Sequence, residues 1–140
     1  MVELVEAPAS RRDELGALLR GYMFEFDGST DYPYLDLYWS ESERLPFFVE
    51  RDGDVVGLCL IRLLDGDGWN IAEFSTVPAH RGQGVGRAAV EALAARAGRA
   101  GAPFLQAKIH PDNLQAVGFW LACGFEQIPS ATVVTTRRRL

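Results

Sequence analysis

The sequence has 140 residues, of which 48% are hydrophobic, and its 19 acidic and 14 basic side chains give a formal net charge of −5. This length and balance indicate one soluble globular domain over residues 1–140 that needs no disulfide staples, and the net acidity argues against a nucleic-acid partner. No apolar run approaches the ~20 residues that span a bilayer, no metal-ligand pattern is present, and the N-terminal segment lacks the regions of a signal peptide.

The two cysteines and the charge distribution refine this picture. Cys59 and Cys123 each lie in an apolar run, which favours core thiols in a reducing, cytoplasmic location. Residues 1–54 hold thirteen acids and five bases, whereas residues 55–140 hold six acids and nine bases. The first half is therefore suited to a cationic partner and the second to an anionic one, unless the uneven charge is only a solvated surface.

Hydrophobic periodicity and turn residues predict an antiparallel first half. In chain order, we expect a strand over 2–7, a helix over 10–22, a short helix in the second half of 23–39, and a meander of strands over 45–51, 55–64 and 69–77.

The second half is predicted to contain one βαβ-like step. We expect a helix over 84–99, a strand over 104–109, a helix over 113–125, closing strands over 126–128 and 131–136, and a basic tail end. In the helix over 113–125, Leu114, Val117 and Leu121 form the predicted buried stripe. The elements together predict a mixed α/β fold.

The segment HRGQGVGR, residues 80–87, places three glycines between two arginines at the junction of a predicted strand and helix. The first turn of a helix has unpaired N–H groups and the positive end of the helix dipole, so this junction favours an anion. Glycine lets the backbone approach a ligand and adopt positive φ, and arginine suits phosphate. The segment predicts a phosphate or pyrophosphate cradle; the alternative is a glycine-rich turn that merely ends the strand.

Spacing separates this segment from the common nucleotide loops. A P-loop requires GxxxxGK[ST], and no lysine and hydroxyl residue stand at the required positions. A dinucleotide fingerprint requires GxGxxG after the first strand of a parallel unit, whereas Gly82, Gly84 and Gly86 give GxGxG after a meander strand.

The pattern R-x-x-G-x-G, from Arg81 to Gly86, resembles the acyl-CoA signature of the GNAT N-acetyltransferase superfamily. The longer segment FSTVPAHRGQGVG, residues 74–86, resembles the strand-to-helix segment of that family. NLQAVGFWLACGF, residues 113–125, resembles its second signature, and the order and spacing of the two segments agree with the family. The resemblance extends over residues 45–128 and is weaker over 1–44.

This resemblance implies a mostly antiparallel central sheet of six to seven strands flanked by about four helices, with acetyl-CoA (coenzyme A) as co-substrate and no metal. A bulge in the strand before the glycines would part it from the next parallel strand and leave room for the pantetheine arm. The backbone of Ser75, Thr76 and Val77 would bond to that arm. The pyrophosphate would bind to the cradle, mostly through backbone N–H groups. The residues of this cradle are Arg81, Gly82, Gln83, Gly84, Val85, Gly86 and Arg87. Asn113 would touch the cofactor or simply cap its helix.

The implied reaction is direct attack of a primary amine on the acetyl thioester, which requires removal of a proton from a group with a pKa near 10.4. Glu73 is the best candidate for the base, with a structural salt bridge as its alternative role. Its rivals are Glu25, Asp27, Asp31 and Asp36. Many relatives place the base three residues earlier, where this chain has Asn70.

Trp120 stands where the family usually has a tyrosine that protonates the leaving thiolate. An indole N–H donates a hydrogen bond but is no acid at neutral pH. We expect Trp120 to contact the thioester arm or to belong to the core. Neither cysteine has a matched base, so an acyl-cysteine intermediate is not expected.

Acids and aromatic residues gather in residues 22–39, which would wall the acceptor site in this family. Carboxylates and ring faces suit a cation, so we expect a small amine, a polyamine or a basic N-terminus as acceptor. The candidate acceptor-binding residues are Phe24, Glu25, Asp27, Tyr34 and Glu73. Alternatively, Phe24, Phe26, Tyr34, Leu37 and Trp39 are core residues under a solvated acidic face.

The predicted function is an N-acetyltransferase. The alternative, which rests on Asn70 and Trp120, is a catalytically weak acyl-CoA-binding domain that regulates a partner. The oligomeric state stays open; by analogy with the family, edge-to-edge pairing of residues 131–140 with a second copy would give a homodimer.

Overall fold

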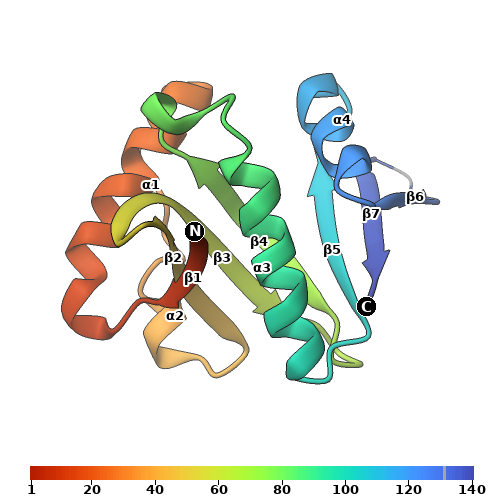
Figure 1. The fold of residues 1–140 in the computed structure, drawn as a ribbon, viewed down its shortest axis with the longest axis horizontal. Coiled ribbons are helices and arrows are strands. Elements are labelled where there is room, and N and C mark those ends of the chain that lie inside the picture. The colour runs from red at the N-terminus through yellow and green to blue at the C-terminus, as the bar shows by residue number, and fades with distance from the viewer. Residues whose placement is uncertain (131) are drawn as a thin grey trace.

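A computed structural model describes residues 1–130 and 132–140, apart from the side chains of Phe26 and Asp27. Seven strands of the described chain form one sheet in the order β1-β2-β3-β4-β5-β7-β6 (Figure 1). They are β1 (Val2–Glu6), β2 (Arg44–Arg51), β3 (Asp54–Leu63), β4 (Trp69–Thr76), β5 (Phe104–Ile109), β6 (Glu126–Ile128) and β7 (Val134–Arg139). All neighbouring strands are antiparallel except β4 and β5, which are parallel. The predicted meander and single parallel step are confirmed.

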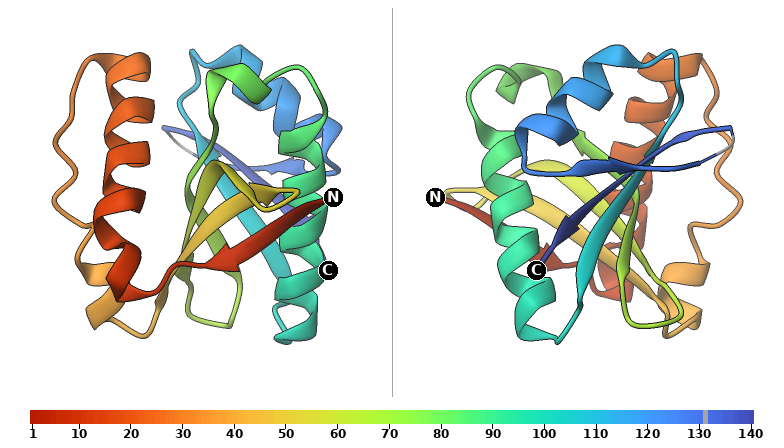
Figure 2. Two further views of the ribbon diagram at one scale, coloured as in Figure 1. Left: turned by 60° about the vertical axis from the view of Figure 1, so that its left-hand side comes forward. Right: turned by 90° about the vertical axis from the view of Figure 1, so that its right-hand side faces the viewer.

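Helices cover both faces of the sheet. They are α1 (Arg12–Asp27), α2 (Leu37–Ser40), α3 (Val85–Arg99) and α4 (Leu114–Ala122). In Figure 2, α1 stands on one side of the sheet, and α3 and α4 stand on the other. Two apolar cores result: Leu15 and Leu19 of α1 pack on Phe48, Leu58 and Leu60, while the larger core lies under α3. The structure therefore has the predicted mixed α/β architecture with helices on both faces.

Helix α1 is longer than the sequence predicted. It continues five residues past residue 22 and ends where Gly28 takes a left-handed conformation with φ 77°, its N–H donating to Phe24 O at 2.9 Å. A glycine in this conformation is the common end of a helix. The first acidic and aromatic residues of the predicted acceptor segment are thus helical.

The predicted buried stripe of α4 is wrong at two of its three positions. Leu114 is 75% exposed and Leu121 is 43% exposed, whereas Trp120 is buried and Phe119 packs against the core. Ala116, Trp120 and Cys123, which lie in or against the core, repeat with the helical period as the predicted leucines do, so periodicity alone does not choose between the two faces. The larger apolar area of the aromatic rings accounts for the observed choice.

The C-terminal residues also differ from the prediction. β7 runs to Arg139, so the basic residues predicted as a tail belong to a strand. Two of these arginines have partners within the fold. The Arg137 guanidinium lies 4.1 Å from the ring centroid of Phe104, and Arg138 forms an ion pair with Glu91 at 2.5 Å. β7 lies between β5 and β6, which corrects the prediction that this segment is a free edge for a second copy.

Within the described residues, no helix has both the length and the apolar character required to cross a membrane.

Gly57 tests how closely β3 and β4 approach each other. A Cβ at Gly57 would lie 2.2 Å from the backbone oxygen of Ser75. We expect Gly57→Ala to lower the free energy of unfolding by about 1–3 kcal/mol, since the strands must separate. Gly98→Ala in α3, where a Cβ meets nothing within 4 Å, is the matched control and should be neutral or stabilising. Urea denaturation measures both; equal stability of the two variants would contradict this packing.

Candidate active site

A bulge in β4 creates the opening on which the site is built. Leu60 of β3 pairs with Glu73, but Ile61 pairs with Ile71, so Ala72 is an extra residue. β4 then pairs with β5 only through Trp69, Asn70 and Ile71, although it continues to Thr76. A bulge bends its strand and increases the local twist, which turns the end of β4 away from β5. The bulge and the parting implied by the family resemblance are both present.

Beyond Ile71, the edge of β4 that faces this opening has no partner strand among the described residues. Val77 N–H donates to Val56 O of the β3 side at 2.8 Å, and Val77 O accepts from His80 N at 3.0 Å. Both backbone groups of Val77 are thus bonded within the protein, and the predicted contact of its backbone with a cofactor stays a prediction that this bonding does not favour. Backbone groups of successive strand residues point to opposite edges, so those of Phe74 and Thr76 face the opening.

A groove of about 340 Å³ occupies this opening between β4 and α4. Phe119 and Trp120 form its apolar wall, and the edge of β4 forms the other. The predicted cofactor residues that line it are Ser75, Thr76, Arg81, Gly86, Asn113 and Trp120.

The glycine bend continues from this groove as a cradle. Gly82 and Gly84 have φ of 73° and 78°, and Gly84 is the N-cap of α3 without any side-chain cap. Such a left-handed bend before a helix aims successive N–H groups at one point, which fits an anion. A Cβ at Gly86 would lie 3.2 Å from the Phe119 ring, so a larger residue here would make a tight contact with that ring. Gly82, Gly84, Val85, Gly86 and Arg87 line the adjoining cavity.

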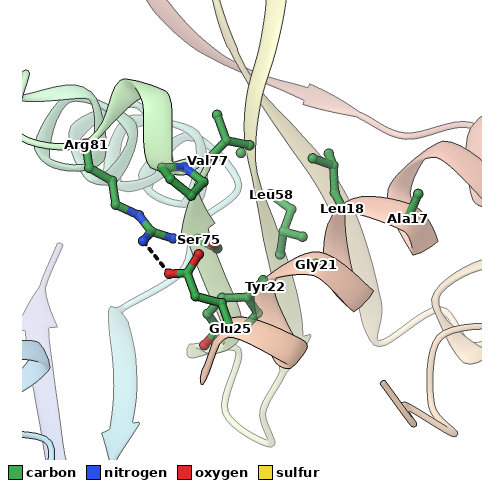
Figure 3. A pocket seen from close by; sticks show the side chains of 11 residues that line it. Ala17, Leu18, Gly21, Tyr22, Glu25, Leu58, Ser75, Val77 and Arg81 are labelled. Carbon is green, nitrogen blue, oxygen red and sulfur yellow. Dashed lines mark hydrogen bonds and ion pairs between the residues drawn. The ribbon is translucent and has the colours of Figure 1, made fainter. Parts of the chain in front are cut away.

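Two side chains of the predicted cradle point elsewhere. Gln83 accepts a hydrogen bond from Arg51 Nη1 at 2.5 Å and donates to Ala79 O at 3.3 Å, so its side chain is directed away from the bend. Arg81 donates from Nε to Thr76 O at 2.9 Å, and its Nη1 bonds to the carboxylate of Glu25 at the end of α1 (Figure 3). The long arginine side chain thus reaches across the end of β4.

Asn113 has the capping role that the sequence left open. Its Oδ1 accepts a hydrogen bond from Ala116 N at 3.1 Å at the start of α4. This bond uses the oxygen only, and the side chain also borders the groove, so contact between its amide NH₂ and a cofactor stays a prediction.

Trp120 belongs to the core and also borders the groove. It is 7% exposed, and its ring centroid lies 5.4 Å from Phe74, 5.0 Å from Phe119 and 5.0 Å from Phe125. Aromatic edge contacts of this kind hold a ring firmly in place. Trp120 therefore gives the groove a rigid apolar wall.

Glu73 lies next to the bulge, on the face of the sheet that α1 and α2 cover and not on the face of α4 and Trp120. Its neighbour Ala72 packs in the core under α1 and α2. Burial raises the pKa of Tyr32 and Tyr38, and the negative charge of Glu73 raises both further. Both phenols therefore keep their protons at neutral pH. The carboxylate thus has two phenols in its vicinity, both from the segment that the sequence assigned to the acceptor.

Asn70 is held by a network that sequence reasoning missed. Gln106 Nε2 donates to Asn70 Oδ1 at 3.1 Å, and Gln106 Oε1 accepts from Arg137 Nε at 2.9 Å. Gln106 is only 4% exposed. The network joins β4, β5 and β7 just before β4 and β5 part. The signal in the sequence was a glutamine in the run FLQAKI, whose only other polar side chain is Lys108.

A second cavity, of about 300 Å³, lies between α1 and the β3–β4 side of the sheet (Figure 3). Its walls are mainly apolar and include Leu18, Leu58 and Val77, while Glu25 and Arg81 supply the charge. Sequence reasoning found Glu25 but missed the small residues Ala17 and Gly21, which leave room beside α1.

The other predicted acceptor residues lie apart from this cavity or outside the description. Phe24 and Tyr34 are 65% and 52% exposed, and neither lines it. The side chain of Asp27 lies outside the described residues. Trp39 donates from its indole to Ala7 O at 2.9 Å, which supports the core alternative for this residue.

Comparison with known proteins identifies the family. The model of the acetyltransferase (GNAT) family matches residues 12–125. The chain therefore belongs to the GNAT acetyltransferase family, and it is an acyltransferase by family. No curated protein gives a significant match. Among the described residues, no group of three or more His, Cys, Asp or Glu is placed to hold a metal ion.

Solved structures share the fold at low sequence identity. A GNAT-family acetyltransferase from Staphylococcus aureus Mu50 is similar with a TM-score of 0.82 and 15% identity, covering 100% of this chain and 99% of that one. An aminoglycoside acetyltransferase in complex with coenzyme A is similar with a TM-score of 0.81 and 18% identity, covering 99% of this chain and 95% of that one. The PaiA N-acetyltransferase from Thermoplasma acidophilum, also in complex with coenzyme A, has a TM-score of 0.76 and 11% identity, covering 100% of this chain and 99% of that one.

The cysteines are expected to be unreactive in the folded protein. Both are buried, and burial raises the pKa of each thiol, so the nucleophilic thiolate is scarce at neutral pH and becomes more abundant only as the pH rises. Iodoacetamide at pH 7.5 should label the native chain at least about tenfold more slowly than the urea-unfolded chain, as followed by mass spectrometry. Fast labelling of Cys123 in the native chain would contradict this.

Proposed function

We propose that the chain transfers an acetyl group from acetyl-CoA to a primary amine that is cationic at neutral pH. The observation that carries the proposal is the anion cradle at the end of a strand that parts from its parallel neighbour, with Glu73 next to the bulge and Glu25 between the two cavities. The two family members that bind coenzyme A, one of which acts on aminoglycosides, support the cofactor and the amine.

The residues of the groove fit an acetylated pantetheine with a diphosphate. The diphosphate is held by the N–H groups of Gly82 to Gly86 and the first turn of α3, with Arg87 beside them. The arm bonds to the open edge of β4 at Thr76 and packs on Trp120. Acetyl-CoA supplies the activated acetyl thioester; the chain supplies position, charge and proton removal.

Glu73 acts as general base on the amine. Only about one alkyl amine in 2,500 is neutral at pH 7, so a positioned carboxylate or a water held by it must accept the proton. The amine nitrogen bonds to the thioester carbon, the C–S bond breaks, and its electron pair leaves with the sulfur. The Phe74 N–H, at the open edge just after the bulge, donates to the carbonyl oxygen as negative charge develops there.

The absence of a tyrosine at position 120 slows this reaction without preventing it. A thiol has a pKa near 8.5, so the thiolate leaves without full protonation. Tyr32 keeps its proton because burial raises its pKa, which makes it a hydrogen-bond donor. Asn70 is bonded to Gln106 and does not replace Glu73 as base.

The test is release of free thiol from acetyl-CoA with a panel of amines that includes polyamines and peptides with basic N-termini. Turnover with a cationic amine supports the proposal. Tight binding of acetyl-CoA without turnover of any amine would favour the alternative, an acyl-CoA-binding domain that regulates a partner. Failure of acetyl-CoA at many times its expected Kd to raise Tm would reject both.

Gly84 tests the cradle. Gly84→Ala should weaken coenzyme A binding by about tenfold or more, because a Cβ there strains the bend and shields its N–H groups. Gly101→Ala is the matched control, since Gly101 follows the other end of α3 with a similar φ of 85°. Calorimetric titration should show loss of affinity in Gly84→Ala only. Equal affinities in the two variants would place the diphosphate elsewhere.

Glu73→Gln tests the base. We expect kcat/KM at pH 7 to fall by about 10²–10⁴, because the amide cannot accept the proton. The deficit should shrink as the pH rises toward about 10.4, where the amine is neutral without help. A purely structural role would leave the deficit independent of pH. Glu3→Gln on the edge strand β1 is the control and should retain the parental rate at each pH.

A further inference from the structure

Arg81 stands between the two cavities of the site. The groove beside α4 and the cavity beside α1 share four lining residues: Tyr22, Glu25, Ser75 and Arg81. Figure 3 shows the arginine and Glu25 pointing toward each other across the mouth of the second cavity. Their ion pair therefore forms a wall common to the cofactor side and the acceptor side.

Each contact of Arg81 uses a group that the proposed function needs for a substrate. Its Nε bonds to Thr76 O, which lies on the edge where the pantetheine arm is proposed to bind. Its Nη1 bonds to Glu25, the carboxylate in the acceptor cavity. A carbonyl oxygen accepts up to two hydrogen bonds, so an arm bonded to Thr76 O shares that acceptor with Arg81 Nε and weakens the anchor that holds the guanidinium against Glu25.

The ion pair is suited to exchange. The side chains of Arg81 and Glu25 are 44% and 46% exposed, and exposed pairs of this kind contribute little to stability. A diphosphate offers the guanidinium several charged oxygens in a geometry that allows two parallel hydrogen bonds. The arginine therefore gains by leaving the carboxylate for the cofactor.

We propose that acetyl-CoA and Glu25 compete for Arg81, so that binding of the cofactor releases the Glu25 carboxylate to a cationic acceptor. This inference rests on the proposed function. Since coupling between two ligands is reciprocal, a cation that draws Glu25 away also raises the affinity for the cofactor. One exposed ion pair thereby links the filling of the two sites.

The test measures the Kd of coenzyme A by calorimetric titration, which is independent of turnover. Glu25→Gln removes the competitor and should tighten binding about two- to fivefold. Glu14→Gln is the matched control, because Glu14 lies on the same helix, is 47% exposed and pairs with Arg11 at 2.7 Å. It should leave the Kd unchanged. In an Arg81→Gln background, Glu25→Gln should no longer have an effect.

The outcomes separate the two proposals. Unchanged or weaker binding in Glu25→Gln, with normal binding by the parent chain, would overturn the exchange and leave the proposed function intact. Equal tightening in Glu14→Gln, or in the Arg81→Gln background, would show a general charge effect and would also overturn it. No binding of coenzyme A by the parent chain would reject the proposed function and the exchange together.

Discussion

The extra residue in β4 is the constraint from which the other features of the site follow. Ala72 has no counterpart in β3, so the ladder with β3 continues while the ladder with β5 ends at Ile71. Backbone groups at Phe74 and Thr76 are left facing the opening, and the α4 residues fill its other wall. A strand edge without a partner strand would be a liability elsewhere; in the proposed function it is the edge to which the extended ligand bonds.

Sequence reasoning predicted those parts of the site that local spacing determines. Glycines at alternate positions between a strand and a helix define a cradle wherever the domain places them, and positive φ at Gly82 and Gly84 agrees with that reasoning. The bulge has no local signature, and only the family resemblance implied it. The exposed face of α4 and the direction of Arg81 depend on residues distant in sequence, such as Phe74 and Glu25, and could not be read from periodicity.

The two departures from the family pattern acquire structural roles in this chain. Asn70 is fixed by Gln106 at the last paired residues of β4 and β5, where a neutral amide can both donate and accept. Trp120 fills the space between Phe74 and Phe125 with a larger ring than tyrosine. Neither position carries an ionisable group, and this is why the proposed chemistry depends on Glu73 and on the low basicity of the leaving thiolate.

The two cavities share a wall because only the width of β4 separates them. One cavity lies on each side of the end of β4, and a long side chain just beyond that end borders both. Arg81 occupies this place, five residues after Thr76, with which it bonds. Its partner Glu25 is available because α1 continues to Asp27 before Gly28 ends it. The position of a helix end therefore decides whether Arg81 has a carboxylate within reach, and the proposed coupling of cofactor and acceptor depends on that contact.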